Sequence, residues 1–178
     1  ERLAFLINSY NALTIELVVD NWRVKSINDI GGLLAPPWKK RFFTLLEERE
    51  YLEHLQTELI RKTYHDPRVL FALSCAAKSC PPLRPEAYVG GRLNHQLEEA
   101  TQAFLKDRSK NHYDAKANTV FVSSMFKWYS GDFEDKYGSV QAFIAPRIAR
   151  SPEEQTLLEE KKTKIKFNDF DWTLNEAT

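Results

Sequence analysis

The chain has 178 residues, of which 43% are hydrophobic and 28% are charged, and its 25 Lys and Arg residues balance its 25 Asp and Glu residues. This length allows one domain with a real core, and equal charges exclude the basic surface of a dedicated nucleic-acid-binding protein. We therefore expect no nucleic-acid partner. The two cysteines exclude a disulfide-rich scaffold and leave the redox compartment open.

The first predicted element is a helix over residues 3–19, where apolar residues recur at helical spacing. Its other side also carries apolar residues, which predicts burial on most sides. Asn8 and Asn11 lie within it, and because Asn is a poor residue inside a helix, both need partners or a purpose. They either satisfy loop carbonyls or orient a catalytic group.

The start of the chain indicates a trimmed or processed protein. Glu1 stands in place of a Met and directly precedes the apolar segment, so any signal peptide or anchor would not be seen. No apolar run approaches membrane-spanning length, so we expect no membrane span in this chain.

Residues 20–41 are predicted to form a connection, because paired glycines and paired prolines interrupt regular structure. The letters FFTLL at 42–46 favour a short strand. A helix is then expected over about 47–63, with Thr44 or a neighbour as its cap, and it carries Glu53 and His54.

Both cysteines lie in the stretch 66–83, DPRVLFALSCAAKSCPPL. Asp66 before Pro67 is a helix-start signal, which favours a short helix, although VLFAL would also suit a buried strand. Small residues follow Cys75 and a double proline ends the segment, so a substrate or a partner's backbone could come close to this cysteine.

The remaining elements are predicted from periodicity and turn signals. They are a helix over about 85–106, a hairpin whose second strand is 119–123, a helical turn at 124–129, a helix from Gly138 to about Ala149, a capped helix from Ser151 to about Lys162, and a strand at 164–172. The expected fold is α+β, a single helix-rich domain over 1–178 with a small antiparallel sheet.

Several motifs occur together in one order. They are INSYNALTIELV, LEHLQTELIR, DPRVLFALSCAAKSCPPLR, SSMFKWYSGDF and FDWTLN. Together they resemble the DUF547 family, a domain of unknown function found in bacteria, plants and animals, over nearly the whole chain.

This resemblance implies no settled reaction and no cofactor. Some members of the family carry the domain beside glutaredoxin or signalling modules, and many bacterial members are exported, which favours a periplasmic or exported protein. The family is also similar in arrangement to papain-like or transglutaminase-like folds, which place one cysteine beside a histidine and a polar orienting residue.

The sequence departs from the family pattern at two positions. Leu70 stands where the family has a histidine, and Ser74 stands where Asn is usual. Cys75, Cys80, Glu53 and His54 match the pattern. If the histidine at 70 were the general base, this chain would lack it.

The catalytic hypothesis makes Cys75 a nucleophile, His54 its base and an Asn, Asn8 or Asn11, the orienting group. Glu53 is not expected to orient His54, because adjacent helix residues point in different directions. The residues expected to contact substrate are Tyr10, Glu53, Ser74 and Cys80. Zinc is less favoured, because a second cysteine pair is missing, and no metal is expected.

Three functions stay open on these grounds. The first is a thiol-dependent hydrolase or acyl transferase acting on peptide or thiol substrates. The second is a non-catalytic module that binds a peptide or glutathione, which the loss of the histidine at 70 favours. The third is a redox or structural disulfide between Cys75 and Cys80, which forms if their Cα atoms come within about 7 Å.

Overall fold

The structure is a computed structural model that describes residues 1–32, 36–160 and 162–176. The chain divides into two compact units. Unit 1 comprises Glu1–Leu97 with Asp171–Thr178, and unit 2 comprises Glu98–Phe170. The prediction of one domain over 1–178 stays a prediction.

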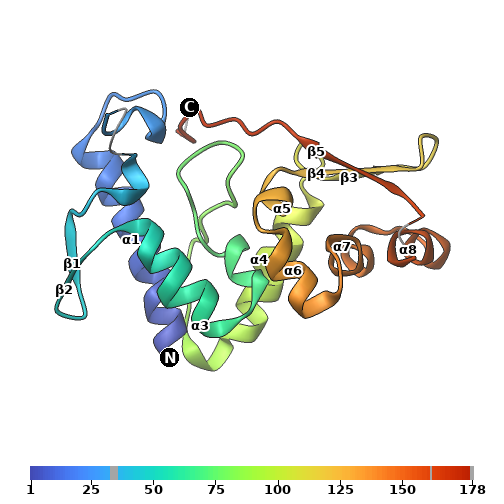
Figure 1. Cartoon of the computed structure of the whole chain (residues 1–178), viewed down its shortest axis with the longest axis horizontal. Coiled ribbons are helices and arrows are strands. Elements are labelled where there is room, and N and C mark those ends of the chain that lie inside the picture. The colour runs from blue at the N-terminus through green and yellow to red at the C-terminus, as the bar shows by residue number, and fades with distance from the viewer. Residues whose placement is uncertain (33–35, 161, 177–178) are drawn as a thin grey trace. The chain divides into compact units, whose positions relative to one another are not determined.

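Unit 1 is organised around helix α1 (Arg2–Asp20), drawn in blue in Figure 1. Leu6, Ile7 and Leu17 of α1 enter the core of the unit, and the helix packs against η3 (Leu55–Arg61). The predicted helix over 3–19 is therefore confirmed. The predicted burial on most sides is wrong, because Ile15 and Val19 are 45% and 59% exposed.

Helix α1 is also long and apolar enough to span a membrane by length and composition alone, with a mean hydropathy of 1.2. The expectation that no segment approaches that length is corrected accordingly. This is weak evidence for a membrane segment, because core helices and signal sequences pass the same test, and α1 supplies part of the core of unit 1.

The next elements of unit 1 are short. Two 3₁₀ turns, η1 (Ile27–Asp29) and η2 (Pro37–Lys39), lie in the predicted connection, of which residues 33–35 fall outside the described part of the chain. The predicted strand is confirmed as β1 (Phe43–Leu45), and it pairs with β2 (Glu48–Glu50). The helix therefore starts later than expected, as α2 (Leu52–His54), because Leu46 and Glu47 adopt positive φ angles that turn the chain back.

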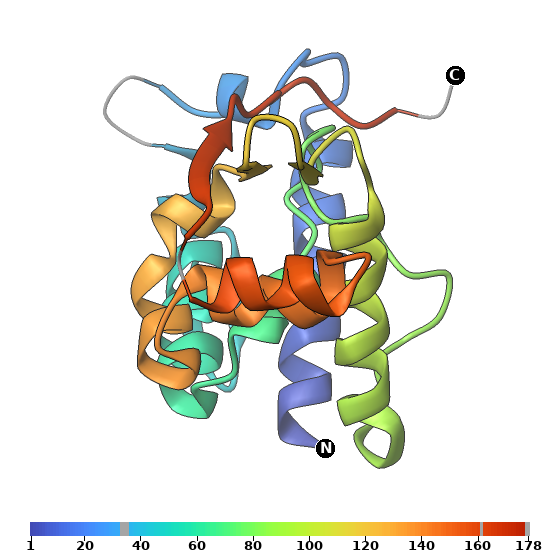
Figure 2. The same cartoon turned by 90° about the vertical axis from the view of Figure 1, so that its right-hand side faces the viewer.

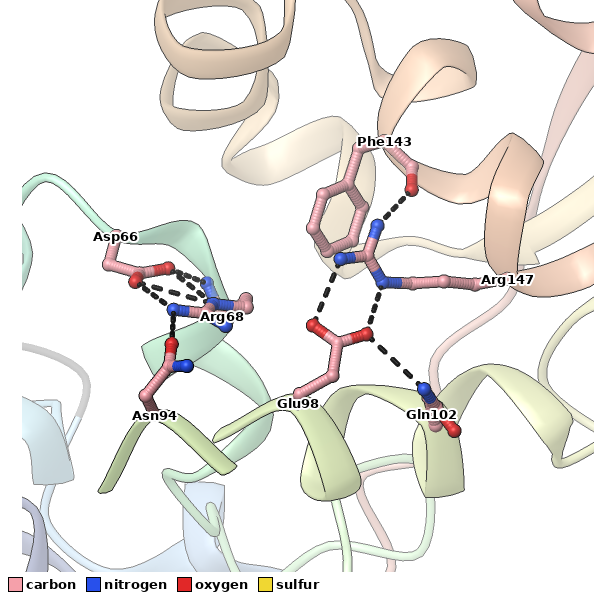
Figure 3. A network of polar contacts seen from close by, with 7 residues as sticks. All are labelled: Asp66, Arg68, Asn94, Glu98, Gln102, Phe143 and Arg147. Carbon is pink, nitrogen blue, oxygen red and sulfur yellow. Dashed lines mark hydrogen bonds and ion pairs between the residues drawn. The ribbon is translucent and has the colours of Figure 1, made fainter. Parts of the chain in front are cut away.

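Helix α2 continues into η3, which has π-helical geometry, and then into α3 (Lys62–Tyr64). Asp66 caps the following 3₁₀ helix η4 (Pro67–Phe71), where its carboxylate accepts a hydrogen bond from Arg68 N at 3.1 Å. The guanidinium of Arg68 returns to Asp66 and also donates to Asn94 Oδ1 at 2.9 Å (Figure 3). The short helix predicted at this point is therefore confirmed in its 3₁₀ form.

The helix predicted over 85–106 is confirmed from residue 90 onward. It begins as η5 (Gly90–Arg92) and continues as α4 (Leu93–Lys106), which starts in unit 1 and ends in unit 2.

Unit 2 contains a sheet of three strands, β3 (His112–Asp114), β4 (Thr119–Ser123) and β5 (Lys164–Asn168). The predicted hairpin is confirmed as the antiparallel pair β3 and β4, and β5 lies parallel to β4. The α+β prediction is confirmed, with a mixed sheet in this unit.

The helices of unit 2 are α5 (Met125–Trp128), α6 (Ser130–Tyr137), α7 (Val140–Ile148) and α8 (Pro152–Glu159). Sequence periodicity missed α6, whose segment carries Gly131 and several charged residues. Figure 2 shows α8 packed beside α7. Phe126, Phe133 and Phe143 pack their rings together in the interior of the unit.

Candidate functional site

The centre of the candidate site is a disulfide between Cys75 and Cys80, whose Cα atoms lie 5.6 Å apart. Cys80 is buried and its Sγ accepts a hydrogen bond from Ala77 N at 3.2 Å, whereas Cys75 is partly exposed. In this structure the two cysteines are bridged, as the third of the functions left open by the sequence required. While the bond is intact, Cys75 has no thiolate with which to attack a substrate.

Asn11 holds the chain that leads into this disulfide loop (residues 75–80). Its Nδ2 donates to Ala72 O at 2.9 Å, and its Oδ1 accepts from Ser74 N at 2.8 Å. Asn8 makes the same pair of bonds with Tyr88, at 2.8 and 2.9 Å. The two asparagines therefore satisfy loop backbone groups, the first of the two roles open on sequence grounds, and Asn8 is engaged with Tyr88.

The disulfide loop also holds the C-terminal segment of unit 1 in an extended form. Ala77 and Leu174 form an antiparallel bridge. Around this bridge, hydrogen bonds run from Lys78 N to Thr173 O at 2.9 Å, from Ser79 N to Asp171 O at 3.2 Å and from Asn175 N to Ala76 O at 2.9 Å. The loop thus acts as a short strand that binds a second strand.

The opposite edge of the same segment is held by the chain that follows α1. Leu174 N donates to Lys25 O at 2.9 Å, and Ser26 Oγ donates to Trp172 O at 2.8 Å. Leu174 is buried in the core of the unit. Residues 171–175 are therefore seated between two loops, chiefly by backbone hydrogen bonds, which is how proteins bind extended peptides.

A cleft of about 500 Å³ lies beside this segment. Its first wall is α1 and the turn that follows it, with Asn11, Thr14, Ile15, Val18, Val19 and Trp22. Its second wall is the disulfide loop region and the C-terminal segment, with Ser74, Ala76, Leu83, Leu174, Asn175 and Glu176. The exposed Ile15 and Val19 of α1 line this cleft, and among the described residues that line it Glu176 alone is charged.

His54 is oriented by Glu50, a residue that the sequence analysis did not identify. His54 Nδ1 lies 2.7 Å from Glu50 Oε2, and the Glu50 side chain is only 9% exposed. A carboxylate on one ring nitrogen leaves Nε2 for other partners. The spacing of four residues was the available signal, because both residues fall in the helix predicted over about 47–63, where residues four apart share a face. In the structure the same pair joins the end of β2 to α2.

The other predicted site residues lie in different surroundings. Glu53 pairs with Lys39 at 3.5 Å, in line with the expectation that it does not orient His54. Tyr10 is buried in the core. Within the described part of the chain, no hydrogen bond or ring contact joins His54 to Cys75.

Leu70 is 1% exposed and lies in η4. The position at which the resemblance led us to expect a histidine is therefore enclosed in this chain. Ser74, by contrast, lines the cleft, and Cys80 forms one end of the disulfide loop.

A charged cluster surrounds the loop that carries Tyr88. Hydrogen bonds from Arg84, then from Arg92 and Gln96, lower the pKa of Glu86 to about 2. Burial raises the pKa of Tyr88 to about 12, against the opposing charge of Arg84.

Among the residues that the structure describes, no three His, Cys, Asp or Glu side chains gather as a metal site would require.

A family model described as "Protein of unknown function, DUF547" matches residues 1–105. No curated protein and no solved structure matches the chain. These comparisons give no support to a similarity with papain-like or transglutaminase-like folds, and the motifs SSMFKWYSGDF and FDWTLN lie outside the matched range. Because the matched residues make up more than half of the 178, the chain belongs to the DUF547 family.

Proposed function

We propose that this chain is a non-catalytic peptide-binding module whose site is the cleft between α1 and the disulfide loop. The observation that supports it best is the cleft of about 500 Å³ with exposed Ile15, Val19 and Trp22 on one wall. Large apolar side chains that line a hollow are what ligand sites share. The disulfide removes the nucleophile that a thiol-dependent hydrolase would need.

The occupant that the cleft fits is an extended peptide with a large apolar side chain next to a basic one. The walls are mostly apolar, and within the described part of the chain Glu176 is the single charge that lines the cleft. A lysine or arginine beside the apolar anchor would therefore be favoured. The neighbouring segment 171–175 illustrates the mode, because the disulfide loop already binds an extended strand through its backbone.

A titration with two capped tetrapeptides tests this proposal. One carries adjacent leucine and lysine, and the other has serine in place of the leucine. We expect the leucine peptide alone to shift the Trp22 indole N–H and Val19 amide signals in NMR spectra of the oxidised protein. Val19→Asp should weaken binding by about tenfold or more, because burying one leucine side chain contributes about 1.5–3 kcal/mol.

Phe5→Asp is the matched control, because Phe5 lies on the same helix, is 50% exposed and is not among the residues that line the cleft. This variant should leave peptide binding unchanged. Equal responses to both peptides, or equal losses in both variants, would overturn the proposal. Binding of a fatty acid such as decanoate in place of the peptide would reassign the cleft to lipids.

Thiol chemistry is the second candidate, in the reduced protein only. It is favoured by the partial exposure of Cys75 and by the Glu50–His54 pair, which would give the imidazole a fixed orientation. After reduction, alkylation of Cys75 at neutral pH much faster than that of a model thiol, and slowed by His54→Ala, would support it. Sluggish labelling would exclude it.

A further inference from the structure

Unit 2 contains a hollow of about 270 Å³ that adjoins a smaller one of about 120 Å³. The two share Arg108, His112, Tyr113 and Arg150 as common walls. Lys116 lines the larger hollow and Lys106 the smaller one. Cationic side chains from three separate places in the chain therefore meet at one concave site: the end of α4 and the turn after it, the β3–β4 turn, and the segment before α8.

The cations of this hollow differ from neighbouring cations in having no carboxylate partner. Within the described residues, the side chains of Arg108, Lys116 and Arg150 make no ion pair and no hydrogen bond. Arg147, in contrast, forms a two-pronged pair with Glu98 at 2.9 and 3.0 Å and lies over the Phe143 ring (Figure 3). Lys110 is likewise paired with Asp107 at 3.1 Å.

The two acidic residues of the larger hollow do not neutralise these cations. Asp114 Oδ1 accepts hydrogen bonds from Lys116 N and Ala117 N at 2.9 and 3.1 Å, so it fixes the β3–β4 turn. Glu154 Oε2 accepts from Arg150 N at 2.8 Å. Because the carboxylates serve backbone N–H groups, the guanidinium and ammonium groups keep their donors available.

His112 lines both hollows. Its ring stacks on Phe121 with centroids 4.8 Å apart, which fixes its position on β3. Its Nδ1 atom is enclosed and has no hydrogen-bond partner among the described residues. An enclosed ring nitrogen without a partner is uncommon in folded proteins and is one of the features found at ligand sites.

We propose that this hollow binds a phosphate monoester. Two guanidinium groups with unused planar donors suit the oxygens of a phosphate dianion, and Lys116 adds a third charge. A volume of about 270 Å³ accommodates the phosphate together with part of the group that carries it. This site lies in unit 2 and is independent of the cleft proposed for peptides.

Calorimetric or NMR titration with inorganic phosphate, phosphoserine and sulfate tests the proposal on the full chain. We expect the amide signals of Arg108, His112 and Arg150 to shift in a saturable way with phosphate. Arg108→Gln and Arg150→Gln should each weaken binding by about tenfold, the loss expected for a charge-assisted contact. Tighter binding of phosphoserine than of inorganic phosphate would identify a phosphorylated peptide or amino acid as the source.

Lys116→Gln and Lys127→Gln form a matched pair, because both lysines are exposed in unit 2 and only Lys116 lines the hollow. We expect the first variant to weaken phosphate binding and the second to leave it unchanged. Equal effects of both variants, or binding that survives loss of both arginines, would overturn the site and show general attraction to a basic surface. The absence of saturable binding by any of the three anions would overturn it as well.

Discussion

Asn11 and Ser74 are joined by a hydrogen bond of 2.8 Å that links the central helix of unit 1 to the residue before the disulfide. The same side chain donates to Ala72 O, so a single carboxamide satisfies two backbone groups where η4 has ended and the loop begins. Helix α1 thereby forms one wall of the cleft. Through Asn11 it also holds in place the segment with Ser74 and Cys75, which belongs to the other wall.

Asn11→Ala should lower the free energy of unfolding by about 2–4 kcal/mol, because two backbone groups lose their partner and Asn11 is buried. Asn8→Ala is the control, because it removes the same two kinds of bond at a half-buried position, where water can replace them. Urea unfolding measures both. A smaller loss for Asn11 than for Asn8 would contradict this account.

Reduction of the Cys75–Cys80 bond should lower the free energy of unfolding by about 2 kcal/mol, the value for a closed loop of this short length. The backbone of the loop that binds residues 171–175 then becomes more mobile. We expect faster hydrogen exchange at the Lys78 and Ser79 amides, which donate to this segment. Hydrogen exchange in the double variant Cys75→Ser, Cys80→Ser should not respond to reductant. If reduction of the natural chain left exchange at Lys78 and Ser79 unchanged, the disulfide would not be what holds this loop against residues 171–175.

The Glu50–His54 pair should show a coupling free energy of about 1–3 kcal/mol in a double-mutant cycle to alanine, because the carboxylate is enclosed. The chain offers a matched pair for comparison. Glu58 and Lys62 have the same spacing of four residues and the same 2.7 Å separation, but both side chains are exposed. That pair should give less than about 0.5 kcal/mol. Equal coupling in the two cycles would show that burial does not strengthen the first pair.

Glu86 should make stability depend on pH in acid. Its pKa in the folded protein is lowered from 4.5 to about 2, chiefly by Arg84 and then by Arg92, so the unfolded chain binds this proton first as pH falls. The stabilisation is present above about pH 4.5 and is lost progressively as the pH falls toward 2. Denaturant unfolding should show that, between pH 4.5 and 2, the free energy of unfolding falls less for Glu86→Gln than for the natural chain. An equal fall in both proteins would exclude Glu86 as a contributor.

The sequence determined the elements whose signals are local. Apolar spacing fixed α1, turn residues fixed the hairpin of β3 and β4, and Asp66 with Pro67 fixed the start of η4, because each depends on neighbours within a few positions. The helix containing His54 was placed too early, since the pairing of β1 with β2 outweighed the helical preference of 47–50.

The candidate site was decided by tertiary structure. Sequence identified both cysteines but left open whether their sulfurs stayed apart, because bridging depends on a Cα separation that spacing along the chain does not set. Glu50 beside His54, and Asn11 beside Ser74, likewise required folded distances. The cleft exists because α1 leaves Ile15 and Val19 uncovered while residues 171–176 return to the disulfide loop, a contact between segments about a hundred residues apart that no local pattern encodes.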